Sequence, residues 1–231
     1  MSTFAQRATR GHADLHVEIG FTDGRFDLAD AHPRLHQQLE VLAGACGAAP
    51  ALMSQVHGAE VAVVSSCTDR PVADALLTRE SAVALVVRVA DCVPVLLADP
   101  AAQVIGAAHA GRRGLVAGII PRAVESLRAL GAEDIEAWVG PHICGTCYEV
   151  PESMRDDVAA SVPEAWAHSR WGTPALDIGA GVTAQLARAG CRVETIEGCT
   201  FEDRRLPSFR RDGADSGRLA GVIWMSSGAA R

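Results

Sequence analysis

Apolar side chains along the chain follow a helical period in several segments. Leucines at positions i, i+4 and i+7 over residues 35–42 follow Pro33 and predict a helix over residues 33–44. Residues 121–130 form a second helical segment, which Gly131 is expected to end. Further helices are expected directly after Gly114 and over residues 151–160 and 181–189.

Other segments carry the composition of β-strands. Residues 82–98 form a nearly continuous apolar run that is dense in valine, which is typical of one or two strands buried on both faces. Residues 1–32, by contrast, are polar and irregular, with a turn expected over residues 20–25. Shorter strands are expected over residues 59–64, 103–108, 135–139, 192–196 and 219–225.

The order of these elements predicts the fold class. Strands alternate with helices, and no internal repeat, low-complexity tract or linker interrupts them. A chain of 231 residues, 48% of them hydrophobic, can bury a substantial core. We therefore predict an α+β (mixed α/β) fold: a single layered α-β sandwich domain with a mixed sheet over residues 1–231.

Composition narrows the classes of function and partner. A formal net charge of −7 argues against nucleic-acid binding, which requires a basic face. The chain contains no lysine, so a Schiff-base or general-base lysine is excluded. We expect no membrane span and no signal peptide, because no apolar stretch is long enough for a span and the N-terminal segment lacks an apolar run. Seven scattered cysteines favour reduced thiols and the cytoplasm over a disulfide framework.

Three side chains form a candidate metal site. His57 precedes Gly58, Cys92 lies in the stretch Ala-Asp-Cys-Val-Pro, and His109 begins the stretch His-Ala-Gly-Arg-Arg-Gly. Two imidazoles and one thiolate satisfy three corners of a tetrahedral zinc site and leave the fourth open, as in catalytic zinc sites. The spacings of 35 and 17 residues match no local zinc-finger pattern. Taken singly, each residue is as typical of a hydrogen-bonded histidine or an inert buried cysteine.

Two arginine-rich stretches are candidate anion sites. Arg112 and Arg113 lie between two glycines before an expected helix, so guanidinium groups and a helix N-terminus would meet at one phosphate. A second stretch has two interpretations. It could form an anion-binding site, because guanidinium groups match phosphate oxygens, or it could be ordinary surface charge paired with neighbouring carboxylates. Its basic residues are Arg204, Arg205, Arg210 and Arg211.

The pair Cys144-Gly-Thr-Cys147 has the spacing of a redox or zinc-ribbon motif. A zinc ribbon needs a second pair of the same kind, and Cys191 and Cys199 are eight residues apart. A packed or solvated loop is therefore the favoured interpretation of this stretch.

Six short motifs, taken in order, resemble one known family, and the resemblance covers roughly residues 52–226. The family is that of the multicopper polyphenol oxidase or laccase-domain (YfiH-like) proteins, whose members are also described as purine nucleoside phosphorylases. The resemblance implies that His57, Cys92 and His109 bind one zinc ion. The motifs occupy residues 54–58, 73–78, 90–94, 109–114, 140–150 and 208–212.

What the resemblance implies is a zinc-dependent enzyme acting on a small-molecule substrate, a purine nucleoside with phosphate. The reaction would be phosphorolysis of adenosine, inosine, guanosine or methylthioadenosine, with possible deamination of adenosine. Cys92, His109 and Arg113 would form the catalytic set, with Arg113 holding the phosphate. Substrate contacts would come from Arg113, Arg210, Arg211 and Cys147. The usual zinc-deaminase signature, His-x-Glu with Pro-Cys-x-x-Cys, is absent, so deamination rests on the resemblance alone.

The chain departs from the family pattern in three places. Arg112 replaces a tryptophan, while Arg113 matches the usual arginine. Cys144-Gly-Thr-Cys147 replaces a Cys-Cys pair, which keeps Cys147 and moves the other thiol. The family's glycine-rich N-terminal segment is not recognisable in residues 20–32, so we assign no substrate contact to that segment.

Three alternative functions remain open at this point. A copper-dependent oxidase is disfavoured: none of the eight histidines forms the His-x-His pairs of a trinuclear cluster, although one His₂Cys set could bind a single copper ion. A Cys–His hydrolase would use Cys92 as nucleophile and His109 as base, for example as an amidase on a peptidoglycan precursor. A non-enzymatic metal-binding protein would need a fourth protein ligand, such as Cys147 or His142. The oligomeric state is left open.

Overall fold

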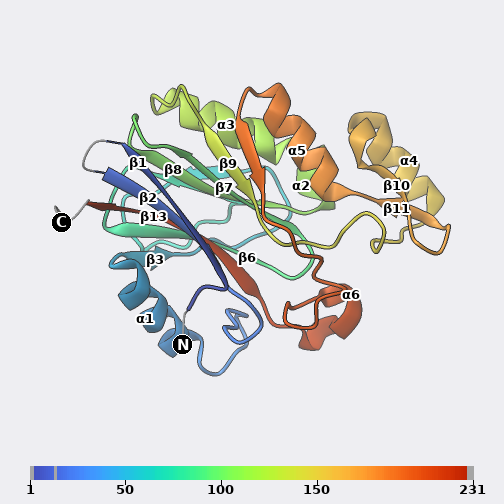
Figure 1. Cartoon of the computed structure of the whole chain (residues 1–231), viewed down its shortest axis with the longest axis horizontal. Helices are drawn as coiled ribbons and strands as arrows, with labels where there is room; N and C mark the ends of the chain where they lie inside the picture. The colour runs from blue at the N-terminus through green and yellow to red at the C-terminus, as the bar shows by residue number, and fades with distance from the viewer. Residues whose placement is uncertain (1–2, 13–14, 228–231) are drawn as a thin grey trace.

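Two stacked β-sheets form the framework of the computed structural model, which describes residues 3–12 and 15–227 (Figure 1). The remaining residues of the domain expected over 1–231, among them the first two of the N-terminal segment, lie outside the described residues. One sheet has the order β1 (Gln6–His12), β2 (Leu15–Phe21), β13 (Leu219–Ser227), β6 (Val83–Val89) and β3 (Ala49–Ala51). The other has the order β12 (Arg192–Thr195), β9 (Glu136–Val139), β7 (Val93–Asp99), β8 (Val104–Ala110), β5 (Ala75–Thr78) and β4 (Val61–Val63). Both sheets contain parallel and antiparallel pairs.

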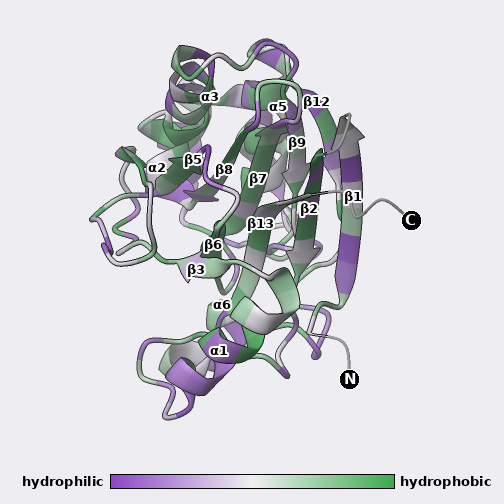
Figure 2. Cartoon of the chain, turned by 90° about the vertical axis from the view of Figure 1, so that its left-hand side faces the viewer, coloured by the Kyte–Doolittle hydropathy of each residue, from purple (hydrophilic) through white to green (hydrophobic). Residues whose placement is uncertain are grey.

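Helices cover the outer faces of the two sheets. On the six-stranded sheet lie α2 (Arg112–Val116), α3 (Ile119–Ala129) and α5 (Ile178–Arg188), while α1 (Leu35–Cys46) lies against the five-stranded sheet (Figures 1 and 2). The layers therefore follow the order helix, sheet, sheet, helix, and the mixed α and β class predicted from the sequence is confirmed. The smaller elements are α4 (Glu152–Ser161), η1 (Pro163–Ala165), the ribbon of β10 (Trp166–His168) and β11 (Pro174–Leu176), α6 (Phe209–Asp212) and η2 (Gly213–Asp215).

The apolar run over residues 82–98 forms two strands that belong to different sheets. Every residue of β6 and of β7 is buried, because a core fills the space between the sheets and helices cover each outer face. A strand buried on both faces carries a continuous apolar run instead of an alternating one. The chain crosses from one sheet to the other between Val89 and Val93, and Cys92 lies in this crossing.

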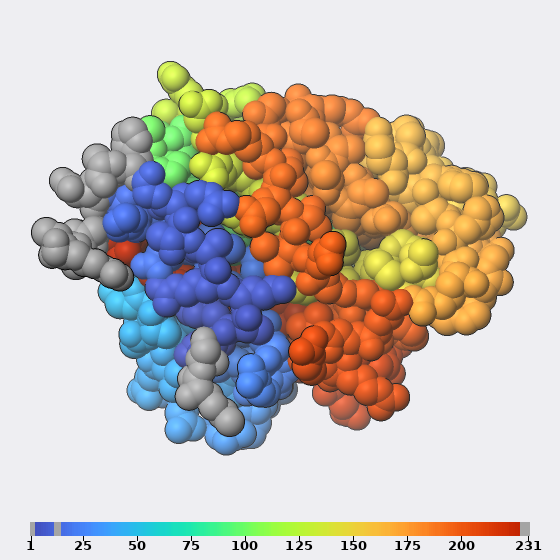
Figure 3. All heavy atoms as spheres, in the orientation of Figure 1, coloured from blue at the N-terminus to red at the C-terminus, as the bar shows by residue number. Residues whose placement is uncertain are grey.

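The prediction for the N-terminal region was wrong. Residues 1–32 were expected to be irregular, but β1 and β2 form an antiparallel hairpin there, and β2 pairs with β13. Val17, Ile19 and Phe21 are buried between the sheets, and the polar residues that alternate with them face away. This alternation is the period of a half-buried strand. Figure 3 shows these strands beside the segment that carries α6 on one face of the molecule.

Several boundaries also differ from those expected. The helix predicted over residues 33–44 runs from Leu35 to Cys46 and ends at Gly47, whose φ of 65° is a left-handed conformation that favours glycine. The helices predicted to begin after Gly114 and at Pro121 begin earlier, at Arg112 and Ile119. The short strands β3, β5, β10 and β11 were not anticipated. No helix in the described part of the chain is both long and apolar enough to cross a membrane.

Candidate metal centre

The structure brings His57, Cys92 and His109 together from three separate elements. His57 lies in the loop between β3 and β4, Cys92 in the crossing between β6 and β7, and His109 near the end of β8. Their ligand atoms all lie within 4.8 Å of one another, with Cys92 Sγ 3.7 Å from His57 Nε2. Tetrahedral zinc with ordinary bond lengths places neighbouring nitrogen and sulfur ligands about 3.5 Å apart. The three side chains therefore fit one metal ion.

The exposure of the three ligands leaves one side of the centre accessible. His109 is buried, Cys92 is half-buried and His57 is exposed. The two imidazole rings are 4.7 Å apart and nearly perpendicular, at 79°. His142 and Cys147, considered above as fourth ligands, belong to other surroundings: His142 Nδ1 lies 2.8 Å from the Gly140 carbonyl, and Cys147 belongs to a second cluster of thiols. Among the described residues, three side chains and no fourth could thus hold an ion here, which would leave one position open, as in catalytic zinc sites.

Asp74 is a residue that the sequence analysis did not assign to the site. It is fully buried, and its Oδ1 lies 2.8 Å from His109 Nδ1. Its carboxylate also accepts the backbone N–H groups of His57 at 3.0 Å and Gly58 at 2.7 Å. Because Nδ1 of His109 is engaged, Nε2 is the nitrogen that can face a metal. The sequence feature that could have indicated this role is a carboxylate inside the otherwise apolar stretch Ala-Asp-Ala-Leu-Leu.

The charges at the centre favour a thiolate. Burial alone would raise the pKa of the Cys92 thiol, but hydrogen bonds with His109 and His57 lower it to about 6. Burial likewise lowers the pKa of His109, while hydrogen bonds with Asp74 and Cys92 raise it to about 9. Burial raises the pKa of Asp74, yet its hydrogen bonds, first that with His109, leave it below the usual range. The thiolate is the form of cysteine that binds metals, so this arrangement suits metal binding.

The backbone on both sides of the centre is constrained. His57 and Asp91 have φ values of 60° and 85°, in the left-handed region that non-glycine residues rarely adopt and that often marks functional sites. Asp91 is held there by three contacts. Its Oδ1 accepts the Thr200 hydroxyl at 2.6 Å, its Oδ2 accepts the Arg210 N–H at 2.6 Å, and its carbonyl accepts the Ile143 N–H at 3.0 Å. These bonds fix the crossing that carries Cys92.

Gly111 leaves the space that the ligands occupy. A Cβ at this position would lie 2.5 Å from Cδ2 of His57 and 3.1 Å from Sγ of Cys92. Its φ of −82° and ψ of 171° suit alanine, so Gly111→Ala should fold but displace His57. Overpacking of this kind costs about 1–3 kcal/mol, so zinc affinity should fall about tenfold or more in a competition titration.

Gly44→Ala is the matched control for this prediction, because a Cβ placed at Gly44 would meet no atom within 4 Å other than those of its chain neighbours and its own helix backbone. It should leave zinc affinity unchanged. Unchanged affinity in Gly111→Ala would show that the ligands do not occupy the positions described.

The three ligands line one wall of a cleft of about 1020 Å³. Arg112, Tyr148, Phe209 and Arg210 also line the cleft near the centre. The Arg210 guanidinium lies 5.0 Å from the centre of the Tyr148 ring and donates to the Glu149 carbonyl at 2.9 Å. Burial raises the pKa of the Tyr148 hydroxyl, and so does the neighbouring Cys92, while Arg112 and Arg210 oppose the rise. The lining of the cleft also includes the polar side chains of Asp30, Arg70, Arg88 and Arg218.

Other residues singled out in the sequence lie outside the cleft lining. Arg113 is exposed and donates to the Val56 carbonyl at 3.3 Å, whereas its neighbour Arg112 lines the cleft. Arg211 donates to the Thr200 and Leu206 carbonyls at 2.7 and 2.8 Å and pairs with Asp212, so it holds the loop before α6. Arg112 belongs to the stretch named above as a candidate phosphate site, whereas Tyr148 and Phe209 were not assigned to the site.

Comparison with known proteins identifies the family. A model of the family described as multi-copper polyphenol oxidoreductase laccase matches residues 16–226. The chain belongs to this family. A purine nucleoside phosphorylase of Streptomyces coelicolor is 53% identical to it over 195 residues, which cover 80% of this chain and 80% of that protein. A purine nucleoside phosphorylase of Mycobacterium tuberculosis is 43% identical over 180 residues, or 75% of this chain and 71% of that protein.

Solved structures of family members share the fold. A Neisseria meningitidis protein assigned to DUF152 superposes with a TM-score of 0.81 and 28% identity, covering 98% of this chain and 100% of that one. YlmD of Geobacillus stearothermophilus superposes with a TM-score of 0.80 and 26% identity, covering 96% and 98%. The resemblance drawn from the six motifs is thus confirmed, and the relatives indicate that this chain is an enzyme.

Proposed function

We propose that the chain is a zinc-dependent purine nucleoside phosphorylase whose centre is formed by His57, Cys92 and His109. The observation that carries the proposal is a single cleft that combines a three-ligand metal centre, cationic side chains and aromatic rings. The names of the related phosphorylases support the same activity. A His₂Cys donor set suits zinc, although copper binds such sets as well.

The side chains of the cleft suit the three parts of the reactants. Arg112 lies beside the centre and would hold phosphate, because a guanidinium group matches phosphate oxygens. Phe209 is 55% exposed, yet it lines the cleft, so its ring is available to pack on a purine base. Zinc would supply a Lewis acid that polarises a substrate atom when bound. Tyr148, held between Arg210 and Arg112, would orient the substrate between the base and the phosphate.

The reaction balances without any further co-reactant. A phosphate oxygen forms a bond to C1′ of the ribose while the bond from C1′ to the base nitrogen breaks. The electron pair of that bond leaves with the base, and the proton of hydrogen phosphate ends on the base. The products are the free purine and ribose 1-phosphate, or 5-methylthioribose 1-phosphate when the substrate is methylthioadenosine. The proposed substrates are adenosine, inosine, guanosine and methylthioadenosine.

Deamination of adenosine does not form part of this proposal. Deamination requires a carboxylate that can act as general acid and base near an activated water. Among the described residues that line the cleft, the carboxylates are Asp30 and Asp91. Asp91 is engaged through both oxygens, and Asp30 pairs with Arg88 and Arg70. Hydrogen bonds from Arg88 lower the pKa of Asp30 to about 2, against burial, so it would not carry a proton at neutral pH.

The test of the proposal is product analysis with purified, zinc-loaded protein. Adenosine with phosphate should yield adenine and ribose 1-phosphate, and His57→Ala, Cys92→Ala and His109→Ala should each lose the zinc ion of this centre and turnover together. Absence of turnover with all four nucleosides, with zinc shown to be bound, would overturn the proposal.

Replacement of the two neighbouring arginines separates their roles. Arg112→Ala should raise the KM for phosphate, because a charge-assisted hydrogen bond contributes about 1.5–3 kcal/mol, or roughly ten- to a hundredfold. Arg113→Ala should change the KM for phosphate by less than about threefold, since its guanidinium donates outside the cleft lining. Initial rates at varied phosphate measure both values. The reverse order of effects would move the phosphate site to Arg113.

A Cys–His hydrolase is the second candidate function. The observation that favours it is a half-buried thiol 3.7 Å from one imidazole and hydrogen-bonded to another. Zinc bound to the same sulfur would compete with nucleophilic attack. One Cys92 side chain therefore cannot bind zinc and act as a nucleophile at the same time.

A further inference from the structure

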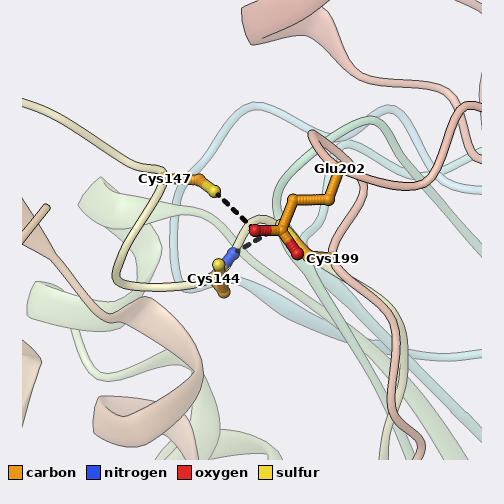
Figure 4. Close-up of side chains that lie close together, drawn as sticks. All are labelled: Cys144, Cys147, Cys199 and Glu202. Atoms are coloured by element: carbon orange, nitrogen blue, oxygen red, sulfur yellow. Dashed lines mark hydrogen bonds between the residues drawn. The ribbon is translucent and has the colours of Figure 1, made fainter. Parts of the chain in front are cut away.

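A second cluster of potential ligands lies outside the cleft lining. Cys144, Cys147, Cys199 and Glu202 place one sulfur or oxygen atom each within 4.8 Å of one another (Figure 4). Cys147 is buried, Cys144 and Cys199 are half-buried, and Glu202 is exposed. The sequence analysis set the Cys-x-x-Cys pair aside because Cys191 lies too far from Cys199 for a second pair. The structure supplies the third thiol from Cys199 alone and leaves Cys191 elsewhere.

Strand order explains why these residues meet. β9 and β12 are parallel neighbours, with Arg192 opposite Glu136, so the loops that follow them leave the same edge of the sheet. An isolated bridge joins His142 to Cys199, and it includes an N–H from Thr200 to the His142 carbonyl at 3.0 Å. The two loops are therefore held side by side by their backbones.

Within the first loop, a tight turn brings together the two cysteines of the Cys-x₂-Cys pair. The N–H groups of Cys147 and Tyr148 donate to the Cys144 carbonyl at 2.9 and 3.1 Å, which closes a tight turn between the two cysteines. The backbone N–H of Cys144 donates to Sγ of Cys199 at 3.4 Å, an interaction that stabilises a thiolate. A Cys-x₂-Cys turn is the usual source of two ligands in structural zinc sites.

The charges around the cluster suit a bound divalent cation. Three thiolates and one carboxylate around a divalent ion leave two negative charges in excess. Arg170 donates to Sγ of Cys147 at 2.7 Å and pairs with Glu202, so a cation lies on the outer side of the cluster. Glu202 Oε1 is also 3.5 Å from Sγ of Cys147. An outer partner of this kind commonly orients and neutralises metal ligands.

We propose that Cys144, Cys147 and Cys199 bind a second zinc ion, with Glu202 as the fourth ligand. Four protein ligands close the coordination sphere, so the ion is structural. It joins the loop that leads to Tyr148, which lines the cleft, to the loop whose Thr200 hydroxyl holds Asp91. The second ion thereby stabilises the wall of the cleft next to Cys92. This proposal is independent of the reaction that the first centre catalyses.

Zinc content of matched variants tests the proposal. Protein purified under reducing conditions, without added chelator, should hold two zinc ions per chain. His57→Ala and Cys199→Ser should each hold one, and the double variant should hold none. Cys191→Ser is the control for loss of a thiol, since Cys191 lies outside both groups of ligands, and it should keep two.

Three further measurements keep the proposal falsifiable if Cys199→Ser folds poorly. Cobalt(II) loaded into the His57→Ala protein should give the intense sulfur-to-metal charge-transfer band of a tetrahedral thiolate site. Glu202→Gln changes an exposed side chain, and in the His57→Ala background it should weaken zinc binding by about tenfold or more. Zinc should also raise the melting temperature of the His57→Ala protein, because an ion that binds only the folded chain stabilises it.

Two results would overturn the proposal. One is a His57→Ala protein that binds no zinc while all seven thiols react as free thiols under native-like conditions. The other is a disulfide between any two of Cys144, Cys147 and Cys199, found by mass spectrometry in protein that was never exposed to an added oxidant. That second result would show that two of the three cysteines form a redox-active disulfide and that the third is a free thiol.

Discussion

Asp74→Ala should lose both stability and metal, although Asp74 is not itself a proposed ligand. The change removes the acceptor for two strong backbone N–H bonds, to His57 and Gly58, and for Nδ1 of buried His109. A buried group left without its partner costs about 1–3 kcal/mol, so the free energy of unfolding should fall by at least about 3 kcal/mol. Loss of such an outer partner also weakens metal binding by about 10- to 100-fold. Urea unfolding and a zinc competition titration measure the two effects separately.

Asp99→Ala is the matched control for that experiment. Asp99 is also a buried carboxylate, and it accepts the backbone N–H groups of Ala101, Ala102, Glu133 and Asp134. It lies at the opposite end of β7 from Cys92, about 20 Å away along the strand. Asp99→Ala should therefore destabilise the chain comparably and leave zinc affinity unchanged. Equal zinc affinities in the two variants would show that Asp74 does not orient the ligands.

The types of ligand could be inferred from the sequence, but the manner in which they are held could not. His57, Cys92 and His109 each lie beside a glycine or in a break between apolar segments, and such positions suit a site at strand ends. Asp74 has no local signal of comparable strength, because one carboxylate before a short strand is also typical of a turn. Its partners at positions 57, 58 and 109 are distant in sequence. Residues 57 and 58 approach it through the pairing of β4 with β5, and His109 through the pairing of β5 with β8.

The sequence also could not decide which strands lie beside each other. An apolar run such as 82–98 indicates burial on both faces, yet it does not show that β6 and β7 belong to different sheets. That crossing is what places Cys92 at the rim of the cleft. The role of Cys199 was missed for the same reason, because its distance from Cys144 depends on the adjacency of β9 and β12.

The first residue of helix α2 decides which of the two arginines of the Gly-Arg-Arg-Gly stretch faces the cleft. The sequence analysis placed the helix after Gly114 and chose Arg113 for the phosphate. In the structure α2 begins at Arg112, so successive residues already point in directions about 100° apart. Arg112 lines the cleft and Arg113 turns toward the Val56 carbonyl. Side-chain direction on a helix depends on its first residue, which sequence patterns locate least well.

Cys92 can be replaced in a way that separates a metal ligand from a nucleophile. Cys92→Ala removes both properties and should abolish zinc binding at the first centre, with a loss of turnover of at least about a hundredfold. Cys92→Asp keeps an anionic group of similar size that can bind zinc, but it removes the thiol. If Cys92 acts as a ligand, Cys92→Asp should retain one zinc ion at the first centre with lower affinity. It should also cleave adenosine measurably above Cys92→Ala.

Removal of zinc from the wild-type chain completes the comparison. Because a thiolate ligand and a thiolate nucleophile exclude each other, chelation should abolish nucleoside cleavage, and added zinc should restore it. Iodoacetamide should modify Cys92 faster in the zinc-free protein than in the loaded one, since the bound ion shields the sulfur. Turnover that survives chelation, is abolished by iodoacetamide and is absent in zinc-loaded Cys92→Asp would instead assign Cys92 as the nucleophile of a hydrolase. The half-buried thiol beside two imidazoles would then serve as a Cys–His pair, and the metal would be its inhibitor.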